Sequence, residues 1–112
     1  MLIPTALHIP ASFWLYGQKI HVSMETDLIE EEDCVGEARY RKNMSRLQCN
    51  SSSVNRPGSH IEATFLHELI HMILYALGED DLRKNEKLVD GMARLLHQAF
   101  ITMEGAADAP VD

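Results

Sequence analysis

Residues 67–71 have the order His-Glu-Leu-Ile-His, with two imidazoles four positions apart and a carboxylate directly after the first. On an α-helix, residues four apart lie on one face about 6 Å apart along the axis, so His67 and His71 can present nitrogens to one metal ion. Glu68 is rotated by about 100° from His67 and points beside the ion, toward a water bound there. The spacing therefore predicts a metal site with Glu68 as a general base.

The two histidines fall within a stretch that has the periodicity of a helix. Ser59 and Glu62 have the spacing of a capping box, in which each side chain bonds the backbone N–H of the other residue. Gly78 is a typical residue after a helix end. Apolar residues recur between them at helical spacing: Ile61, Phe65, Leu69, Ile73, Leu74 and Leu77. We expect a helix from about residue 60 to 77.

A second helix is predicted to begin at Asp80 or Asp81 as N-cap and to reach about Met103. Its apolar positions form one face: Leu82, Val89, Met92, Ala93, Leu96 and Phe100. Gly91 lies in the middle, where glycine costs about 1 kcal/mol relative to alanine, and this predicts a close approach to a neighbouring backbone.

Zinc held by two histidines needs a third protein ligand and an open position. If the two helices fold back on each other, Glu86 reaches the level of His71, and Asp90 lies one turn further along, as His67 lies one turn earlier. Glu86 is the expected third ligand, with a surface glutamate as the alternative. Asp90 is the expected second-shell partner of a ring N–H, that of His67. Other transition metals accept the same donors, so zinc, Zn²⁺, rests on ligand type.

The first half of the chain predicts a small antiparallel sheet made of two hairpins. The first hairpin turns at Gly17-Gln18, where glycine suits a type II′ turn. The second turns at Lys42-Asn43, which sets Ala38 opposite Leu47. The four predicted strands cover residues 12–16, 19–26, 35–41 and 44–50. The last of these strands is the expected edge along which an extended substrate pairs.

The chain as a whole predicts one α+β domain, in which the sheet is followed by the two antiparallel helices. This domain covers residues 1–103 and starts with an irregular lead-in over 1–11. The acidic run 27–33 is expected to be a solvated loop, and the polar tail 104–112 is expected to be disordered.

Composition narrows the function classes. The formal net charge of −7 argues against general nucleic-acid binding. No run is long enough for a membrane-spanning helix, and we expect no signal peptide. Cys34 and Cys49 do not make a disulfide framework, so a reduced, cytoplasmic protein is expected. Half of the basic residues fall in 39–56, either as a solvated face balanced by the acidic run or as a patch for an acidic substrate or partner.

At these residues the chain resembles the gluzincin class of zinc metallopeptidases, typified by thermolysin. Residues 67–71 match the two ligands and the catalytic glutamate, and residues 85–90, Asn-Glu-Lys-Leu-Val-Asp, look like the downstream Asn-Glu-x-x-x-Asp element. Overall the chain is more similar to the minimal one-domain zincins of bacteria and their phages. The resemblance implies a zincin-like fold and a hydrolase that cuts peptide or protein substrates, with zinc on His67, His71 and Glu86.

The sequence departs from the thermolysin pattern in two respects. The two motifs are closer together, and no counterpart follows of the subdomain that holds the transition-state-stabilising histidine. Possible replacement donors are Tyr40, His60, Tyr75 and Arg41. His97 is expected about 16 Å beyond Glu86, nearer His60 than the metal. The alternative function is a non-catalytic, zinc-stabilised binding or accessory domain of phage or prophage origin. The sequence does not predict an oligomeric state.

Overall fold

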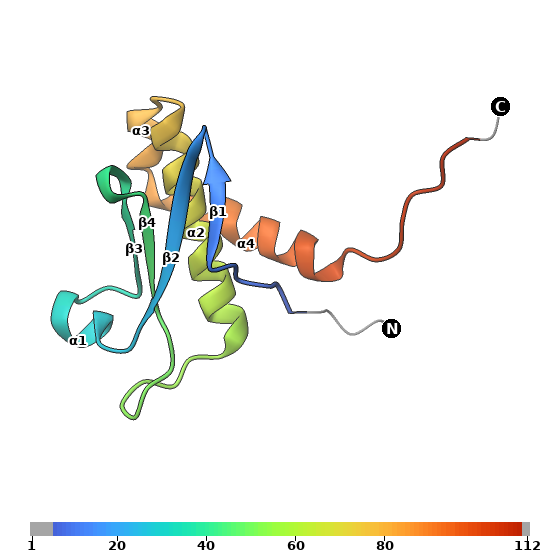
Figure 1. Cartoon of the computed structure of the whole chain (residues 1–112). Helices are drawn as coiled ribbons and strands as arrows, with labels where there is room; N and C mark the ends of the chain where they lie inside the picture. Colours follow the sequence, from blue (N-terminus) through green and yellow to red (C-terminus); the bar gives the residue numbers. More distant parts are fainter. Residues whose placement is uncertain (1–5, 111–112) are drawn as a thin grey trace.

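The computed structural model of the chain describes residues 6–110 (Figure 1). These residues form the α+β arrangement that the sequence predicts, with a four-stranded sheet followed by helices. In chain order the elements are β1 (Ser12–Leu15), β2 (Gln18–Glu25), α1 (Leu28–Glu32), β3 (Gly36–Arg39), the 3₁₀ turn η1 (Tyr40–Lys42), β4 (Met44–Gln48), α2 (Gly58–Ala76), α3 (Asp80–Arg83) and α4 (Glu86–Thr102).

The ends of the chain have no regular structure where they are described. Residues 6–11 and 104–110 contain no helix or strand. The rest of the predicted lead-in, 1–5, and of the predicted disordered tail, 111–112, lies outside the described residues. No helix in the described part of the chain is both long and apolar enough to cross a membrane. The cytoplasmic location stays a prediction.

The sheet is mixed, and the prediction of an all-antiparallel sheet was wrong. Its order is β1-β2-β4-β3, in which β2 and β4 run parallel. The second hairpin docks through β4 because this strand carries the side chains that leave water most completely, with Leu47 and Gln48 both 0 % exposed. β4 therefore lies inside the sheet, and the prediction that it is an edge strand was wrong. The edge strands among the described residues are β1, which pairs with β2, and β3, which pairs with β4.

Both hairpins turn at other residues than predicted, because the backbone conformation of the loops differs from the expected one. Leu15 pairs with Gln18, so the first turn is Tyr16-Gly17. Both residues have positive φ, 50° and 75°, as in a type I′ turn. In the second hairpin, η1 and Asn43 together occupy four residues of loop. This longer loop shifts the register by two, so Leu47 lies opposite Gly36 and not opposite Ala38.

The acidic run forms α1, where a solvated loop was predicted. Leu28 is 1 % exposed and anchors this short helix in the protein. The buried amide of Gln48 holds it as well, since its Oε1 accepts from the Ile29 N–H at 2.9 Å. Arg46 on β4 pairs with Glu25 and Glu32, each at 2.7 Å, so basic side chains of the hairpin balance the acidic run.

The helix α2 confirms the first predicted helix, and Gly78 follows it with φ 73° as expected. The capping box was wrong: Pro57 occupies the N-cap position without a side-chain bond, and Glu62 is buried in other contacts. The second helix is two pieces, α3 and α4, because the side chain of Asn85 accepts from the Leu88 N–H at 3.1 Å and caps a new helix. A Cβ at Gly91 would meet nothing within 4 Å, so the predicted close approach was wrong.

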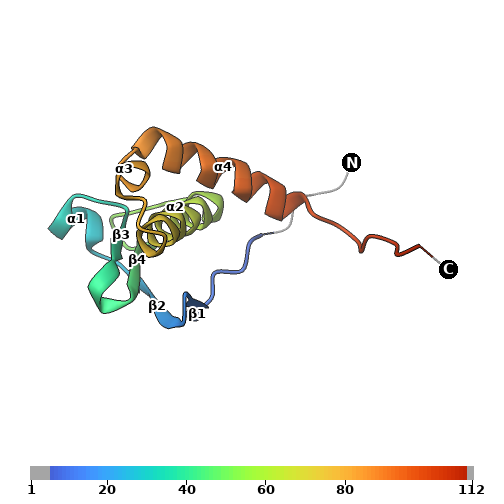
Figure 2. The ribbon, with the colours of Figure 1, turned by 90° about the horizontal axis from the view of Figure 1, so that it is seen from above.

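The helices stack in two layers on one face of the sheet, with α2 between the sheet and α4 (Figure 2). The core lies at these two contacts. It consists of Leu47, Phe65, Leu66, Ile70, Leu74, Val89 and Ala93. Cys34 and Cys49 are free thiols, as the lack of a disulfide framework predicted. Because α2 is covered on both sides, the histidine motif is held on a rigid element.

Candidate metal centre

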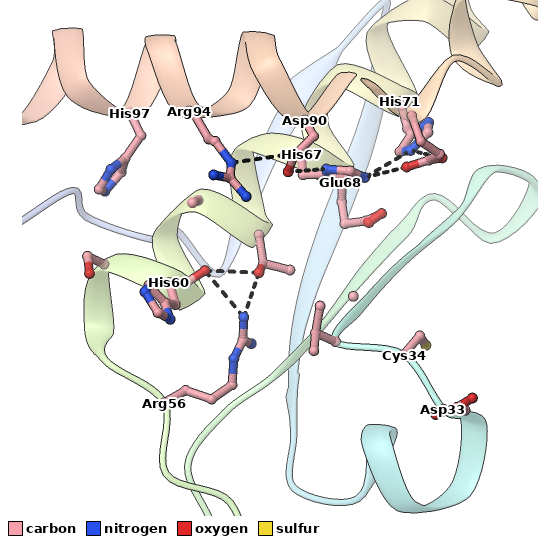
Figure 3. Close-up of a pocket in the computed structure, with 16 residues that line it drawn as sticks. Asp33, Cys34, Arg56, His60, His67, Glu68, His71, Asp90, Arg94 and His97 are labelled. Atoms are coloured by element: carbon pink, nitrogen blue, oxygen red, sulfur yellow. Dashed lines mark hydrogen bonds and ion pairs between the residues drawn. The ribbon is translucent and has the colours of Figure 1, made fainter. Parts of the chain in front are cut away.

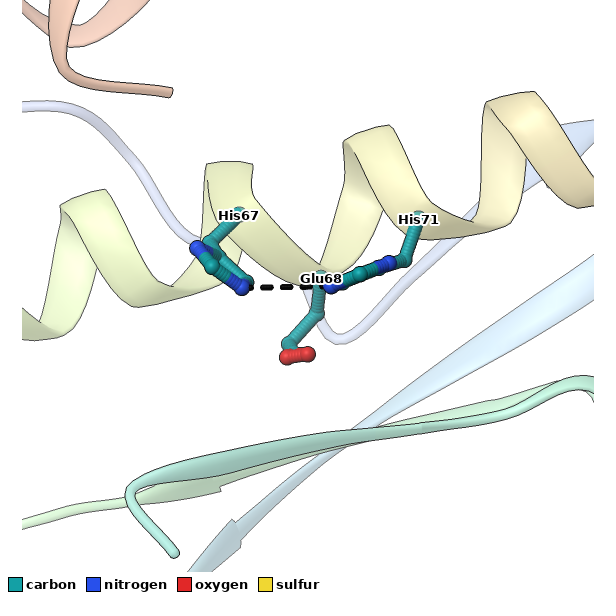
Figure 4. A group of neighbouring side chains, drawn as sticks. All are labelled: His67, Glu68 and His71. Carbon is teal, nitrogen blue, oxygen red and sulfur yellow. Dashed lines mark hydrogen bonds between the residues drawn. The ribbon is translucent and has the colours of Figure 1, made fainter. Parts of the chain in front are cut away.

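His67 and His71 lie one turn apart on the side of α2 that meets α4. Their rings have centroids 4.9 Å apart and are inclined by 61°, and their Nε2 atoms approach to 3.2 Å. Figure 4 shows the two rings converging along α2, with the carboxylate of Glu68 directed toward the sheet. The structure therefore brings the two predicted ligands to one point.

Glu86 reaches the same point from α4. It is the first residue of that helix because Asn85 is the N-cap, so the cap of α4 fixes where this carboxylate begins. Its Oε2 lies 3.0 Å from His67 Nε2, and its Oε1 lies 3.1 Å from His71 Nε2. Glu86 thus lies where the antiparallel arrangement of the helices predicted it, although the side chain is 66 % exposed.

These three separations suit a tetrahedral ion. Zinc ligands at about 2.0–2.1 Å in tetrahedral geometry are separated from one another by about 3.3 Å. The separations found here are 3.0, 3.1 and 3.2 Å. Two imidazoles and one carboxylate are also a common donor set for a catalytic zinc ion with an open position. The residues present therefore fit the predicted ion, and metal binding itself stays a prediction.

Glu68 is the most deeply buried carboxylate of the group. It is 5 % exposed, and one ligand atom each from His67, Glu68 and His71 lie within 4.8 Å of one another. Burial, together with the negative charges of Glu86 and Glu37, raises the pKa of Glu68 to about 7. A carboxylate with a pKa near neutrality is well matched to general-base chemistry at that pH.

Burial also lowers the pKa of His71, against the opposing effect of the Glu86 charge. A neutral imidazole is the form that binds a metal. Its second ring nitrogen, Nδ1, is buried and has no hydrogen bond of good geometry among the described residues. The Arg83 backbone is nevertheless close enough to act on the ring in the direction that favours its protonated form.

Asp90 lies beside His67 as predicted, but not at hydrogen-bond distance. Its Oδ1 is 3.6 Å from His67 Nδ1, a separation too long for a hydrogen bond. Its Oδ2 forms an ion pair with Arg94 Nε at 2.9 Å. Arg94 therefore competes with His67 for Asp90, and only the i, i+4 spacing on α4 indicates this pair in the sequence.

The edge strand β3 passes very close to α2 at the site. A Cβ placed on Gly36 would lie 2.5 Å from Thr64 Cγ2 and 3.2 Å from Glu68 Cγ. Only a residue without a side chain permits this approach. Gly36 thus sets the distance between the strand backbone and the carboxylate of Glu68, a role that sequence analysis missed because the contact depends on tertiary packing.

The centre opens into a cavity of about 840 Å³ between β3, α2 and α4 (Figure 3). Beyond the four central residues, polar side chains from several elements line it: Asp33, Arg56, Ser59, His60, Thr64, Asp90, Arg94 and His97. Of the four predicted oxyanion donors, only His60 is among the lining residues. Tyr40 and Tyr75 instead stack on each other, with centroids 4.4 Å apart, outside this cavity.

His97 lies at the end of the cavity away from the centre, as the helical spacing predicted. Its Nε2 is 2.9 Å from Glu62 Oε1, and that oxygen also accepts from the Leu7 N–H at 2.9 Å. Glu62 therefore joins the N-terminal segment to α2 and α4. Sequence analysis had assigned it to a capping box, because the local spacing gives no sign of a partner 35 residues away.

Comparisons of the chain with protein families, with curated proteins and with solved structures found no match.

Proposed function

We propose that the protein is a zinc-dependent peptidase that hydrolyses peptide bonds with Glu68 as general base. The observation that carries this proposal is the convergence of His67 Nε2, His71 Nε2 and the Glu86 carboxylate to within 3.0–3.2 Å. Beside them lies the buried carboxylate of Glu68, which no side chain in the described part of the chain neutralises. A structural zinc site has no use for such a base, whereas hydrolysis requires one.

His67, His71 and Glu86 would hold the ion, which when bound supplies Lewis-acid polarisation of the scissile carbonyl and acidifies the attacking water. Glu68 accepts the proton of that water and passes it to the leaving amine. In the metal-free chain, burial and the charges of Glu86 and Glu37 raise the pKa of Glu68 to about 7, and a bound cation would favour its ionised form, which is the form that accepts a proton.

The free edge of β3 supports a peptide as the substrate. Its backbone has unpaired groups on the side away from β4 among the described residues, and Gly36 at its start lines the cavity. An extended chain can add to such an edge by main-chain hydrogen bonds, which depend little on its sequence. This replaces β4, which the sequence suggested for that role.

The first test is the metal content of protein purified without a polyhistidine tag. We expect about one zinc per chain, and a large loss in Glu86→Ala, since the geometry gives this carboxylate contacts to both imidazoles. Glu31→Ala on α1 is the matched control, because it removes an exposed carboxylate outside the cavity. Equal zinc in the two variants would exclude Glu86 as a ligand.

The second test separates catalysis from metal binding. Glu68→Gln should keep zinc and lose at least about 10²-fold in turnover of a denatured protein substrate, because the base contributes directly to the proton transfers. Hydrolysis by this variant at the wild-type rate would contradict the proposed mechanism.

One observation favours the second candidate, a zinc-stabilised accessory domain without catalysis. Three of the four donors suggested for the oxyanion lie outside the cavity, and His60 lies in the first turn of α2, almost two turns before His67. An oxyanion donor is typically worth about 10²–10³ in rate. In this alternative zinc would join α2 to α4, so a chelator would lower the melting temperature strongly while no peptide is cut.

A further inference from the structure

Arg56 extends from the loop before α2 into the cavity. Its Nη1 donates to the Gln48 carbonyl at 2.8 Å. Its Nη2 donates to Thr64 Oγ1 at 2.7 Å and to the His60 carbonyl at 3.3 Å. Figure 3 shows this side chain entering from the loop below α2. The guanidinium is thus fixed in one place between the end of β4 and the first half of α2.

All three acceptors of Arg56 are neutral. Arg39, Arg46, Arg83 and Arg94 each pair with a carboxylate, whereas Arg56 makes no ion pair among the described residues. Burial lowers the pKa of the Arg56 guanidinium, and no charge among the described residues offsets this shift. A guanidinium has five N–H donors. The three bonds above leave the Nε hydrogen and one Nη1 hydrogen of Arg56 without a protein acceptor in the described part of the chain.

This unneutralised cation lies close to the candidate metal centre. Thr64, which it contacts, precedes Glu68 by one helical turn, about 6 Å along the axis. The start of β3 lies against both Thr64 and Glu68, since a Cβ on Gly36 would contact both side chains. Arg56 and Glu68 line one cavity. An extended peptide rises about 3.3 Å per residue, so a peptide whose scissile bond is held at the centre can reach the guanidinium with a residue a few positions away.

The direction of β3 indicates which side of the substrate reaches Arg56. The strand begins at Gly36, beside Thr64, and leads to Tyr40, which stacks on Tyr75 further along α2. Antiparallel pairing is slightly more stable per residue than parallel pairing. A peptide antiparallel to β3 therefore enters from the Tyr40 end and directs its C-terminal part toward Gly36 and Arg56.

Arg94 adds a second cation to this part of the cavity. It projects from α4 on the opposite side (Figure 3), where it is 75 % exposed and shares its charge with Asp90. A group lying beside Thr64 would meet Arg56 on one wall and Arg94 on the other. Glu68 and Glu86, the carboxylates assigned to base and metal chemistry, line the same cavity and gather around His67 and His71.

We propose that Arg56 is a specificity-determining residue that binds a carboxylate of the peptide within a few residues on the C-terminal side of the scissile bond. The carboxylate belongs either to an Asp or Glu side chain or to the C-terminus of the substrate. Both present the two oxygens that a guanidinium fork binds. This inference rests on the proposed peptidase function and names its substrate class.

The test begins with the zinc-loaded wild-type chain and a peptide mixture from a digested protein, with cleavage sites mapped by mass spectrometry. We expect carboxylates to be enriched at one position within the first few residues after the cut. Matched synthetic peptides then separate the two sources: Glu against Gln at that position, and a free against an amidated C-terminus. The acidic member should have at least about tenfold higher kcat/KM, as a hydrogen bond to a charged group permits. Equal rates for both pairs would overturn the proposal.

Arg56→Gln should abolish that ratio, and Arg56→Lys should restore part of it. Lys42→Gln is the control, since it removes an exposed charge outside this cavity. A thermal melt checks that each variant folds, because Arg56 also bonds Gln48 and Thr64. If Arg56→Gln does not fold, the ratio in Arg56→Lys decides: an unchanged ratio contradicts a bidentate contact.

A binding measurement distinguishes failure of the proposed peptidase function from failure of the carboxylate site at Arg56. If no peptide is cut, acetyl-Ala-Ala-Ala-Glu-amide and its Gln counterpart are titrated into the wild-type protein, together with the free-acid and amide forms of acetyl-tetra-alanine. NMR shifts of the Gly36 and Thr64 amides report binding at this place. Tighter binding of an acidic member that Arg56→Lys weakens would support the carboxylate site without catalysis, and equal binding would refute it.

Discussion

Replacing Glu68 with Gln should stabilise the metal-free fold at alkaline pH. The reason is the raised pKa of Glu68, about 7 against an ordinary 4.5, caused mainly by burial and then by the charges of Glu86 and Glu37. In the unfolded chain the carboxylate ionises near its ordinary pKa, whereas in the folded chain it retains its proton up to about pH 7. The folded state therefore binds more protons between these values, and its stability falls as pH rises through this window.

The difference between the two pKa values corresponds to about 3 kcal/mol of lost stability above pH 7. Glutamine has nearly the same shape and no charge. The Glu68 carboxylate makes no hydrogen bond to the described residues, so the substitution removes none. Burial of the amide costs about 1–2 kcal/mol on its own. The variant should therefore be more stable than the wild type by at least about 1 kcal/mol near pH 8, and near pH 4.5 this advantage should disappear.

The assay is urea unfolding of both chains in a chelating buffer, followed by circular dichroism at several pH values. Glu31→Gln on α1 is the control, because Glu31 is exposed and its ionisation should affect both states alike. Comparison of each variant with the wild type at the same pH removes the contribution of His71, whose lowered pKa acts in the opposite direction. A difference between Glu68→Gln and the wild type that does not change from about pH 4.5 to about pH 8 would refute the assigned burial of a charged carboxylate.

Two further predictions concern backbone approach and buried polar groups, both measured by urea unfolding. Gly36→Ala should lower the free energy of unfolding by about 1–3 kcal/mol, because the added methyl would lie 2.5 Å from Thr64 Cγ2. Gly91→Ala should raise it by about 0.5–1 kcal/mol, because a methyl there meets nothing within 4 Å. A loss of stability in both variants would contradict this difference in packing. Gln48→Leu should cost about 2 kcal/mol or more, because the Ile29 N–H and the Thr26 carbonyl lose their side-chain partners. Unchanged stability of Gln48→Leu would mean that water replaces both bonds.

Much of the candidate centre could be predicted because its pattern lies within single helices. His67, Glu68 and His71 occupy one turn of α2, and the period of 3.6 residues fixes how they face. Glu86 required one more assumption, that the following helix folds back antiparallel. The structure has that arrangement even though α3 and α4 are separate, since the break lies before Glu86.

The sheet was predicted less well because its order depends on contacts between distant residues. The strands themselves follow from alternation, but nothing local distinguishes β4 beside β2 from β3 beside β2. The decision comes from burial: Leu47 and Gln48 on β4 are completely removed from water, and Gln48 also bonds α1. An acidic run next to a hairpin rich in arginine likewise gave no sign that Leu28 would anchor a helix there.

The residues that define the rest of the cavity were missed for the same physical reason. Gly36 matters because α2 passes within contact distance of its backbone, and Arg56 matters because its acceptors are neutral and its carboxylate partner is absent among the described residues. In the sequence, Arg56 was one of several basic residues opposite an acidic run. The structure divides that group: Arg39 and Arg46 are neutralised by α1 and its neighbours, and Arg56 alone faces the candidate centre. A partly buried cation that has no counter-ion among the described residues indicates a ligand that brings the negative charge.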